Sequence, residues 1–278
     1  MCLAAGATLY SAEIERHWIE ISRRDVFLPG LHVALDGLRI AQLSDIHFDE
    51  FTEPIFLHEA VDRVNRLNPD LIFLTGDFVT QSPISKRVFK DAAWQCAAIL
   101  DQLQCRRRYA CLGNHDVQVG KEKVIAALTA NGIAVVDNSY LPIERSSARF
   151  WLAGLDDPLE GQPDPGAAMP ASIRNLPHEP IVLLCHGPDY ADDLLARPEG
   201  QAVSLMLSGH THGGQICLPF VGPTFLPRFG KKYIKGWFQL GKMQLHVNRG
   251  IGTIRIPMRF NCPPEITFLT LRAPAAQG

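Results

Sequence analysis

The stretch Ser-Gly-His-Thr-His-Gly-Gly-Gln at residues 208–215 decides how the rest of the chain is interpreted, because it holds two histidines one residue apart between glycines. It directly follows an apolar run at residues 203–207, which predicts a short strand. Side chains two residues apart on an extended segment point the same way, so we expect His210 and His212 to reach toward one place. The glycines allow the backbone to turn sharply there. One histidine pair alone is weak evidence for a metal site, so the remaining sequence must decide.

Polar clusters of the same kind follow four earlier apolar runs. The runs at residues 38–43, 71–74, 109–112 and 181–184 each predict a buried strand. The clusters that follow them are Asp45-Ile-His47, Gly76-Asp77, Gly113-Asn114-His115-Asp116 and Cys185-His186. Loops at the carboxyl ends of strands are where α/β folds place ligands, so we expect all five clusters to converge.

The clusters supply carboxylates, imidazoles and one carboxamide, which together resemble a metal-binding set. Oxygen and nitrogen ligands of this kind suit Mn, Fe, Co or Zn. Seven candidate ligands are too many for one tetrahedral ion, but they suffice for two ions that share a bridging carboxylate. The sequence therefore predicts a centre that holds two divalent metal ions.

The order of the predicted elements favours an α/β fold. Apolar residues at helical spacing predict helices at about 54–67, 86–103 and 121–131, between the early strands. Further strands are expected at 133–136, 150–153, 245–247 and 266–271. These later strands follow one another closely, which favours layered, mixed sheets over a purely parallel one.

Few features divide the chain. Residues 15–27 are expected to be extended, and the Pro/Gly-rich residues 161–170 to form a surface loop. We expect a single domain over residues 38–271, with an N-terminal segment and edge strand at 1–37 and a tail at 272–278.

Composition excludes several classes of protein. The 278 residues are 46% hydrophobic and 20% charged, with a formal net charge of -2, so no nucleic-acid partner is expected. No obligate protein partner is evident either. Seven cysteines, without Cys-x-x-Cys spacing, argue against a disulfide framework and suit a reducing compartment.

The N-terminal residues 2–10 are apolar but shorter than the ~20 residues that span a bilayer. They lack the basic region of a signal peptide. Two interpretations stay open: the end of a membrane helix that begins earlier, or a frayed or surface-packed terminus. The expected location is the cytoplasm or the periphery of the cytoplasmic membrane.

The five clusters, in this order and each after a predicted strand, resemble the calcineurin-like metallophosphoesterase family over roughly residues 38–271. The resemblance implies two mixed β-sheets packed as a sandwich and flanked by helices, with two metals at one edge. It also implies hydrolysis of a phosphodiester or pyrophosphate bond by a metal-bridging hydroxide, with Mn favoured among the metals.

Matched by motif position, the resemblance also implies a role for each site residue. The first ion would be held by Asp45, His47 and His212, the second by Asn114, His186 and His210, and Asp77 would bridge both. His115 would be a catalytic histidine outside the ligand set, and Asp116 its orienting partner. The sequence departs from the family pattern at Thr80, where a second Asp is common, which leaves the surroundings of the ligands in doubt.

The substrate is less defined by the sequence. Segments at 209–216, 248–253 and 259–266 are similar to a branch of membrane-associated bacterial phosphodiesterases, some of which hydrolyse UDP-2,3-diacylglucosamine. Arg249, Arg255 and Arg259 are candidate phosphate contacts. The Pro/Gly-rich loop after His212 is either packed on its own core or a lip for a lipid-bearing phosphoester at a peripheral membrane contact. In the second case Lys231, Lys232 and Lys235 would meet anionic head groups.

Two other functions compete with this interpretation. One is a phosphomonoesterase or protein phosphatase, which uses the same metal chemistry. The other is a non-catalytic scaffold of the same fold, although the intact His115, Asp116 and seven candidate ligands speak against it.

Overall fold

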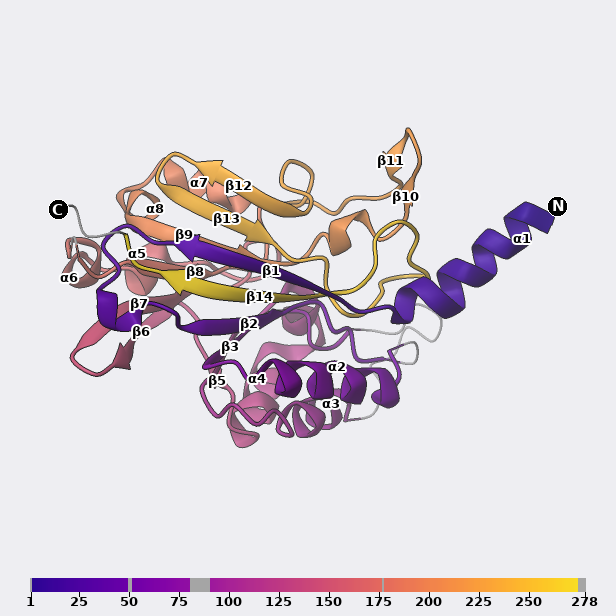
Figure 1. Cartoon of the computed structure of the whole chain (residues 1–278), viewed down its shortest axis with the longest axis horizontal. Coiled ribbons are helices and arrows are strands. Elements are labelled where there is room, and N and C mark those ends of the chain that lie inside the picture. Colours follow the sequence, from indigo (N-terminus) through magenta and orange to yellow (C-terminus); the bar gives the residue numbers. More distant parts are fainter. Residues whose placement is uncertain (1, 50–51, 81–90, 177, 275–278) are drawn as a thin grey trace.

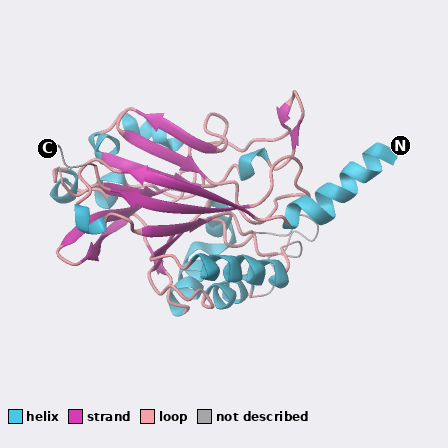
Figure 2. Ribbon diagram, in the orientation of Figure 1, coloured by secondary structure: helices cyan, strands magenta, loops and turns pink. Residues whose placement is uncertain are grey.

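Two mixed β-sheets packed face to face form the centre of the molecule, and helices cover the outer face of each sheet (Figure 1, Figure 2). The computed structural model describes residues 2–49, 52–80, 91–176 and 178–274. The expected α/β class, with two mixed sheets as a sandwich flanked by helices, is confirmed.

The first sheet has six strands in the order β1-β14-β2-β3-β4-β5. Their bounds are Glu20–Phe27, Glu265–Arg272, Arg39–Leu43, Leu71–Thr75, Arg108–Cys111 and Ala134–Val135. Strand β14 runs parallel to β1 and antiparallel to β2, and β2 to β5 are parallel to one another. The carboxyl ends of β2, β3 and β4 therefore meet at one edge of this sheet.

The second sheet also has six strands, in the order β12-β13-β9-β8-β7-β6. Their bounds are Gly236–Leu240, Met243–Val247, Val203–Ser208, Ile181–Leu184, Ala148–Gly154 and Ser139–Arg145. Strands β13, β9, β8 and β7 are parallel, and the two edge strands are antiparallel to their neighbours. A separate short hairpin joins β10 (Cys217–Leu218) to β11 (Gly222–Pro223).

Successive side chains on each strand point to opposite faces of the sheet, and this alternation builds three apolar cores. One lies between the two sheets, and the other two lie between each sheet and its helices. In β3, Phe73 faces the second sheet, whereas Ile72 and Leu74 face the helices. In β8, Val182 faces the first sheet and Leu183 faces the outer helices of its own sheet. Both faces of each central strand are thus buried, which explains why the sequence shows continuous apolar runs there.

The helices fall into two groups. Helices α2 (Pro54–Leu67), α3 (Ala92–Leu100) and α4 (Asn114–Ala130) cover the first sheet, and α5 (Pro165–Ala168), α6 (Ala171–Arg174), α7 (Tyr190–Leu195) and α8 (Pro198–Ala202) lie with the second. Helix α2 ends as expected, because Asn68 adopts a left-handed conformation (φ 48°) before a proline.

Several expected boundaries differ from the structure. Helix α4 begins at Asn114, not near residue 121, so the Gly-Asn-His-Asp cluster is itself a helix N-terminus. Residues 161–170 are not only a surface loop, since α5 lies within them and Met169 is fully buried. The helix expected at 86–103 is α3, and its expected first residues, 86–90, lie outside the described part of the chain. Strands β6 and β12 were missed.

The N-terminal segment forms a helix that extends away from the two sheets (Figure 1). Helix α1 spans Cys2–Leu9 and continues as a π-helix over Tyr10–Ile14. Its C-terminal part, where it meets the two sheets, is tied to the body by the amide of Arg259, which donates to the carbonyl of Ser11 (3.0 Å). Within the described residues, no helix has both the length and the apolar character that crossing a bilayer requires.

Candidate metal centre

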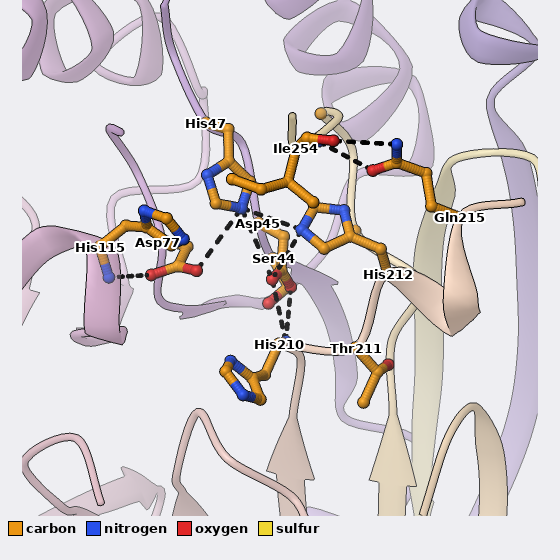
Figure 3. A network of polar contacts seen from close by, with 12 residues as sticks. Ser44, Asp45, His47, Asp77, His115, His210, Thr211, His212, Gln215 and Ile254 are labelled. Carbon is orange, nitrogen blue, oxygen red and sulfur yellow. Dashed lines mark hydrogen bonds and ion pairs between the residues drawn. The ribbon is translucent and has the colours of Figure 1, made fainter. Parts of the chain in front are cut away.

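The loops after five parallel strands converge at one edge of the sandwich. The first sheet contributes Asp45 and His47 after β2, Asp77 after β3, and Asn114 to Asp116 after β4; the second contributes His186 after β8, and His210 and His212 after β9. Figure 3 shows six of these residues gathered in one place. The seven predicted ligand side chains are all buried, each at most 6% exposed.

Backbone conformation is unusual at most of these positions. Five of the seven residues adopt a positive φ: Asp45 (49°), His47 (48°), Asp77 (56°), His210 (73°) and His212 (50°). Residues with a Cβ rarely adopt this region, and such strain is typical of functional sites. The segment that contains the two histidines is therefore not extended as expected, and its two side chains join different clusters.

Two glycines allow the loops to approach one another this closely. A Cβ on Gly113 would overlap the carboxylate of Asp77, and a Cβ on Gly209 would overlap that of Asp45. Any larger residue at either position would displace a candidate ligand.

The first cluster contains Asp45, His47 and His212, whose ligand atoms lie within 4.8 Å of one another. The Nε2 atoms of the two histidines are 2.9 Å apart, and Nε2 of His212 lies 3.4 Å from Oδ1 of Asp45. The backbone amide of His210 donates to both carboxylate oxygens of Asp45 (2.9 and 3.0 Å), which fixes the orientation of that carboxylate.

The second cluster contains Asp77, His186 and His210. Nε2 of His186 lies 3.1 Å from Oδ2 of Asp77, while its Nδ1–H donates to the carbonyl of Thr75 (2.6 Å). Nε2–H of His210 donates to the carbonyl of Arg228 (2.6 Å), which leaves Nδ1 as its ligand atom. Backbone carbonyls that orient the far ring nitrogen are the usual support of metal-binding histidines.

Asp77 lies between the two clusters. Its Oδ2 is 3.5 Å from Nε2 of His47 in the first cluster and 3.1 Å from Nε2 of His186 in the second. A third group of possible ligands, His47, Asp77 and His115, also includes it. One carboxylate is therefore within reach of histidines from both clusters.

Unsatisfied buried atoms indicate that the side chains fit a cation. Oδ1 of Asn114 is buried without a hydrogen-bond partner, and Nε2 of His186 faces Asp77 at 3.1 Å without an aligned hydrogen bond; such buried atoms are costly unless something binds them. Oδ1 of Asn114 adds a neutral oxygen, a donor that manganese and similar ions accept.

The pKa values follow from burial and from the two carboxylates. Burial lowers the pKa of His47 to about 3 and that of His210 to about 4, so both imidazoles are neutral and able to bind metal. Burial also raises the pKa of Asp45 to about 6. Burial disfavours the charged forms of both Asp77 and His186. Their mutual attraction outweighs burial, so the pKa of Asp77 is well below its usual value and the pKa of His186 is well above its usual value. A metal held by His186 would have to displace a proton from it.

His115 lies at the mouth of the centre, and its partner differs from the expected one. Its Nδ1 lies 2.7 Å from the hydroxyl of Thr80, the residue at which the sequence departs from the family pattern that it resembles. Asp116, expected as that partner, instead accepts hydrogen bonds from the backbone amides of Gly113, Asp77, Phe78 and Val79. Asp116 thus joins the loops after β3 and β4, and Thr80 orients His115.

The cations expected to contact substrate have other partners. Arg259 is fully buried and donates to the carbonyls of Arg249, Gly250, Gly252 and Cys262. Arg249 forms ion pairs with Glu20 (2.8 Å) and Glu265 (3.1 Å). Lys232 pairs with Asp192 (2.8 Å). Lys231 is held by its backbone amide, which donates to Asp189, and its side chain is exposed. None of these four lines the cavity described next.

A cavity of about 580 Å³ opens over the metal-ligand residues. One wall is apolar, and the cations that line the cavity are Arg228 and Arg255. The apolar wall comprises Leu159, Ile216, Phe225, Pro227, Ile254 and Ile256. The sequence singled out Arg255 as a candidate phosphate contact, and it offered the apolar loop after His212 as a possible lip for a lipid-bearing substrate. That loop carries part of the lining, namely Ile216, Phe225, Pro227 and Arg228. The rest of the wall, Leu159, Ile254 and Ile256, was missed because no pattern in the sequence marks these residues.

Known proteins share both this sequence pattern and this architecture. The model of the calcineurin-like phosphoesterase family matches residues 38–214. The chain is 35% identical to the phosphodiesterase YaeI of Escherichia coli over 266 residues, which cover 94% of this chain and 92% of that protein.

The chain belongs to the calcineurin-like phosphoesterase family.

Membership of the calcineurin-like phosphoesterase family makes the protein a hydrolase whose chemistry depends on divalent metal ions. A more distant relative is the UDP-2,3-diacylglucosamine pyrophosphatase LpxG of Chlamydia trachomatis, 27% identical over 316 residues, with 94% of this chain and 92% of that protein covered. The NAD nucleotidase of Haemophilus influenzae shares the fold (TM-score 0.52, 13% identity) over 77% of this chain, which spans 45% of that chain.

Proposed function

We propose that this metallophosphoesterase hydrolyses a phosphodiester or pyrophosphate bond with two divalent ions, manganese being favoured. The observation that carries the proposal is the position of Asp77, which is the carboxylate of one buried cluster and also lies 3.5 Å from His47 of the other. Asp45, His47 and His212 would hold one ion, Asn114, His186 and His210 the other, and Asp77 would contact both.

When bound, two such ions neutralise the phosphoryl oxygens and lower the pKa of the attacking water. The chain's own residues supply the rest of the chemistry. Asp77 fixes the spacing of the two half-sites. His115, half-buried at the cavity wall, is placed to stabilise the developing charge or to protonate the leaving oxygen. The hydroxyl of Thr80 holds the imidazole in position for this role.

The cavity favours a substrate with an apolar part. The metal-ligand residues form a polar floor, and six large apolar residues line the walls above it. A lipid-bearing phosphoester such as UDP-2,3-diacylglucosamine, the substrate in the name of the relative LpxG, has this combination of groups. Such a substrate implies peripheral contact with a membrane, and the exposed apolar tip of the β10–β11 hairpin supports this.

Metal stripping and reconstitution test the proposal. The purified protein, freed of metal and then supplied with Mn, Fe, Co or Zn, should bind two ions per chain and hydrolyse bis(p-nitrophenyl) phosphate. Hydrolysis of p-nitrophenyl phosphate should be slower, because the proposed substrate is a diester. Preference for the monoester would favour a phosphatase, and no hydrolysis with any metal would favour a non-catalytic scaffold.

A further inference from the structure

Arg255 lies at the rim of the cavity in a strained conformation. Its φ is +66°, a region that residues with a Cβ rarely adopt. It forms the apex of a turn between Ile254 and Ile256, and all three residues line the cavity. A strained backbone persists only where neighbouring contacts hold it, and such positions cluster at ligand-binding sites.

Gln215 provides these contacts from the metal-binding loop. Its Nε2 donates to the carbonyls of Ile254 and Ile256 (both 3.1 Å), and its Oε1 accepts from the amide of Ile254 (2.8 Å). Figure 3 shows Gln215 joined to Ile254 beside His212. Gln215 therefore fixes the turn on both sides of Arg255. Because Gln215 follows His212 by three residues, the turn is also held at a fixed position relative to this candidate metal ligand.

The side chain of Arg255 is held as well. Its guanidinium carbon lies 3.8 Å from the centre of the Phe225 ring, and Phe225 lines the same cavity. Stacking on an aromatic face restricts a guanidinium to a plane while leaving its N–H groups free to donate.

No carboxylate among the described residues pairs with this cation. Arg255 is exposed and forms no ion pair with any described residue, whereas Arg249 contacts both Glu20 and Glu265. A fixed, unpaired guanidinium beside a cavity is suited to bind an anion, and its planar group of donors matches phosphate.

We propose that Arg255, positioned by Gln215 and Phe225, binds a second phosphate of the substrate, next to the phosphate at the metal centre. This inference rests on the proposed function and narrows it from phosphodiesters in general to diphosphate diesters. Water adds its oxygen to the phosphorus at the metal centre, the bond to the bridging oxygen breaks, and the second phosphate leaves with that oxygen. Two monoesters result, and two protons pass to solvent. Arg255 holds the leaving phosphate throughout.

Paired substrates test the role of Arg255. The diphosphate substrates are UDP-2,3-diacylglucosamine and CDP-diacylglycerol in detergent micelles; the comparison substrate is bis(p-nitrophenyl) phosphate, which has one phosphate. In Arg255→Ala, kcat/KM for the diphosphates should fall roughly 10- to 100-fold, the value of one or two charged hydrogen bonds. The value for bis(p-nitrophenyl) phosphate should stay within about twofold. Arg255→Lys should recover part of the loss.

Two further variants separate positioning from folding. Gln215→Ala should reproduce the selective loss, because the turn is released while the charge is kept. Arg24→Ala is the matched control: Arg24 is also exposed and stacks on an aromatic ring, Trp237 (4.5 Å), but it does not line the cavity. It should leave both activities unchanged. Thermal unfolding and metal content should match the wild type in Arg255→Ala and Arg24→Ala.

Each alternative outcome has a distinct meaning. An equal loss on all substrates, or no loss in Arg255→Ala, overturns the role of Arg255. Wild-type protein that hydrolyses bis(p-nitrophenyl) phosphate but neither diphosphate overturns the inference and leaves the proposed phosphodiesterase intact. Wild-type protein that hydrolyses none of the three overturns the proposed function itself.

Discussion

The floor and the rim of the cavity are built in opposite ways. The floor, defined by the seven candidate metal ligands, is buried and cross-linked by hydrogen bonds at the ends of central strands. The rim, defined by residues 216–228 and 254–256, has only the short β10–β11 hairpin as regular structure. Phe220 is fully exposed at its tip, with Val221 beside it.

The difference indicates that the floor serves catalysis and the rim serves substrate selection. Buried strand ends hold reacting groups at fixed distances, which hydrolysis requires of any phosphoester. Loops on the surface tolerate change, so they are where the choice of substrate is made. Variants of the floor should therefore abolish catalysis, whereas variants of the rim should change only which substrate is hydrolysed.

Asp77→Asn should have the largest effect, because it removes the carboxylate between the two clusters. We expect metal content to fall and turnover to drop on the order of a thousandfold. Elemental analysis and hydrolysis of bis(p-nitrophenyl) phosphate measure both. Asp156→Asn is the control: Asp156 is also buried, but its carboxylate accepts from the backbone amides of Asp157 and Gln162 and belongs to neither cluster. Normal metal content in Asp77→Asn would contradict the shared role.

His115→Ala should reduce turnover while leaving the metal ions in place. The imidazole is outside the proposed ligand set, so its loss removes acid catalysis or charge stabilisation but no ligand. We expect kcat to fall roughly a hundredfold or more. Elemental analysis and hydrolysis of bis(p-nitrophenyl) phosphate test this prediction, and unchanged turnover would show that His115 takes no part in the mechanism.

Thr80→Val should have a smaller effect of the same kind. The valine keeps the shape but loses the hydroxyl that lies 2.7 Å from Nδ1 of His115. One hydrogen bond corresponds to about a tenfold loss in kcat, with KM little changed. Thr80→Ser, which keeps the hydroxyl, should recover the rate; a serine variant as slow as the valine variant would show that packing, not the hydrogen bond, matters.

Phe220→Ser should have the smallest effect. The side chain is fully exposed at the tip of the hairpin, so the free energy of unfolding should change by no more than about 0.5 kcal/mol. Hydrolysis of the soluble substrate bis(p-nitrophenyl) phosphate should be unchanged. Denaturant unfolding and steady-state kinetics test this, and a large loss on the soluble substrate would mean that the rim is part of the catalytic centre.

The floor was visible in the sequence because two signals coincide there. Each buried strand is a continuous apolar run, and each run ends in polar residues, as in residues 71–77. The strands β2, β3, β4, β8 and β9 were therefore predicted to within one or two residues.

Other features depend on the folded geometry and could not be predicted. The contact between Thr80 and His115 joins the loop after β3 to the first turn of α4, 35 residues away, and no local pattern in the sequence indicates it. Strand β6 was missed because Pro142 interrupts it, which an edge strand tolerates. The hydrogen bonds by which Gln215 holds the turn at Arg255 were missed, because they are made to backbone atoms 39 and 41 residues further along the chain.

The insertion of β14 between β1 and β2 has a consequence for biosynthesis. The first sheet cannot be completed until Arg272 has left the ribosome, because β14 lies between β1 and β2 and pairs with both strands. The nascent chain must therefore carry β2, β3 and β4 with an unpaired edge while the whole second sheet is being made, and this edge is a target for chaperones or for misassembly.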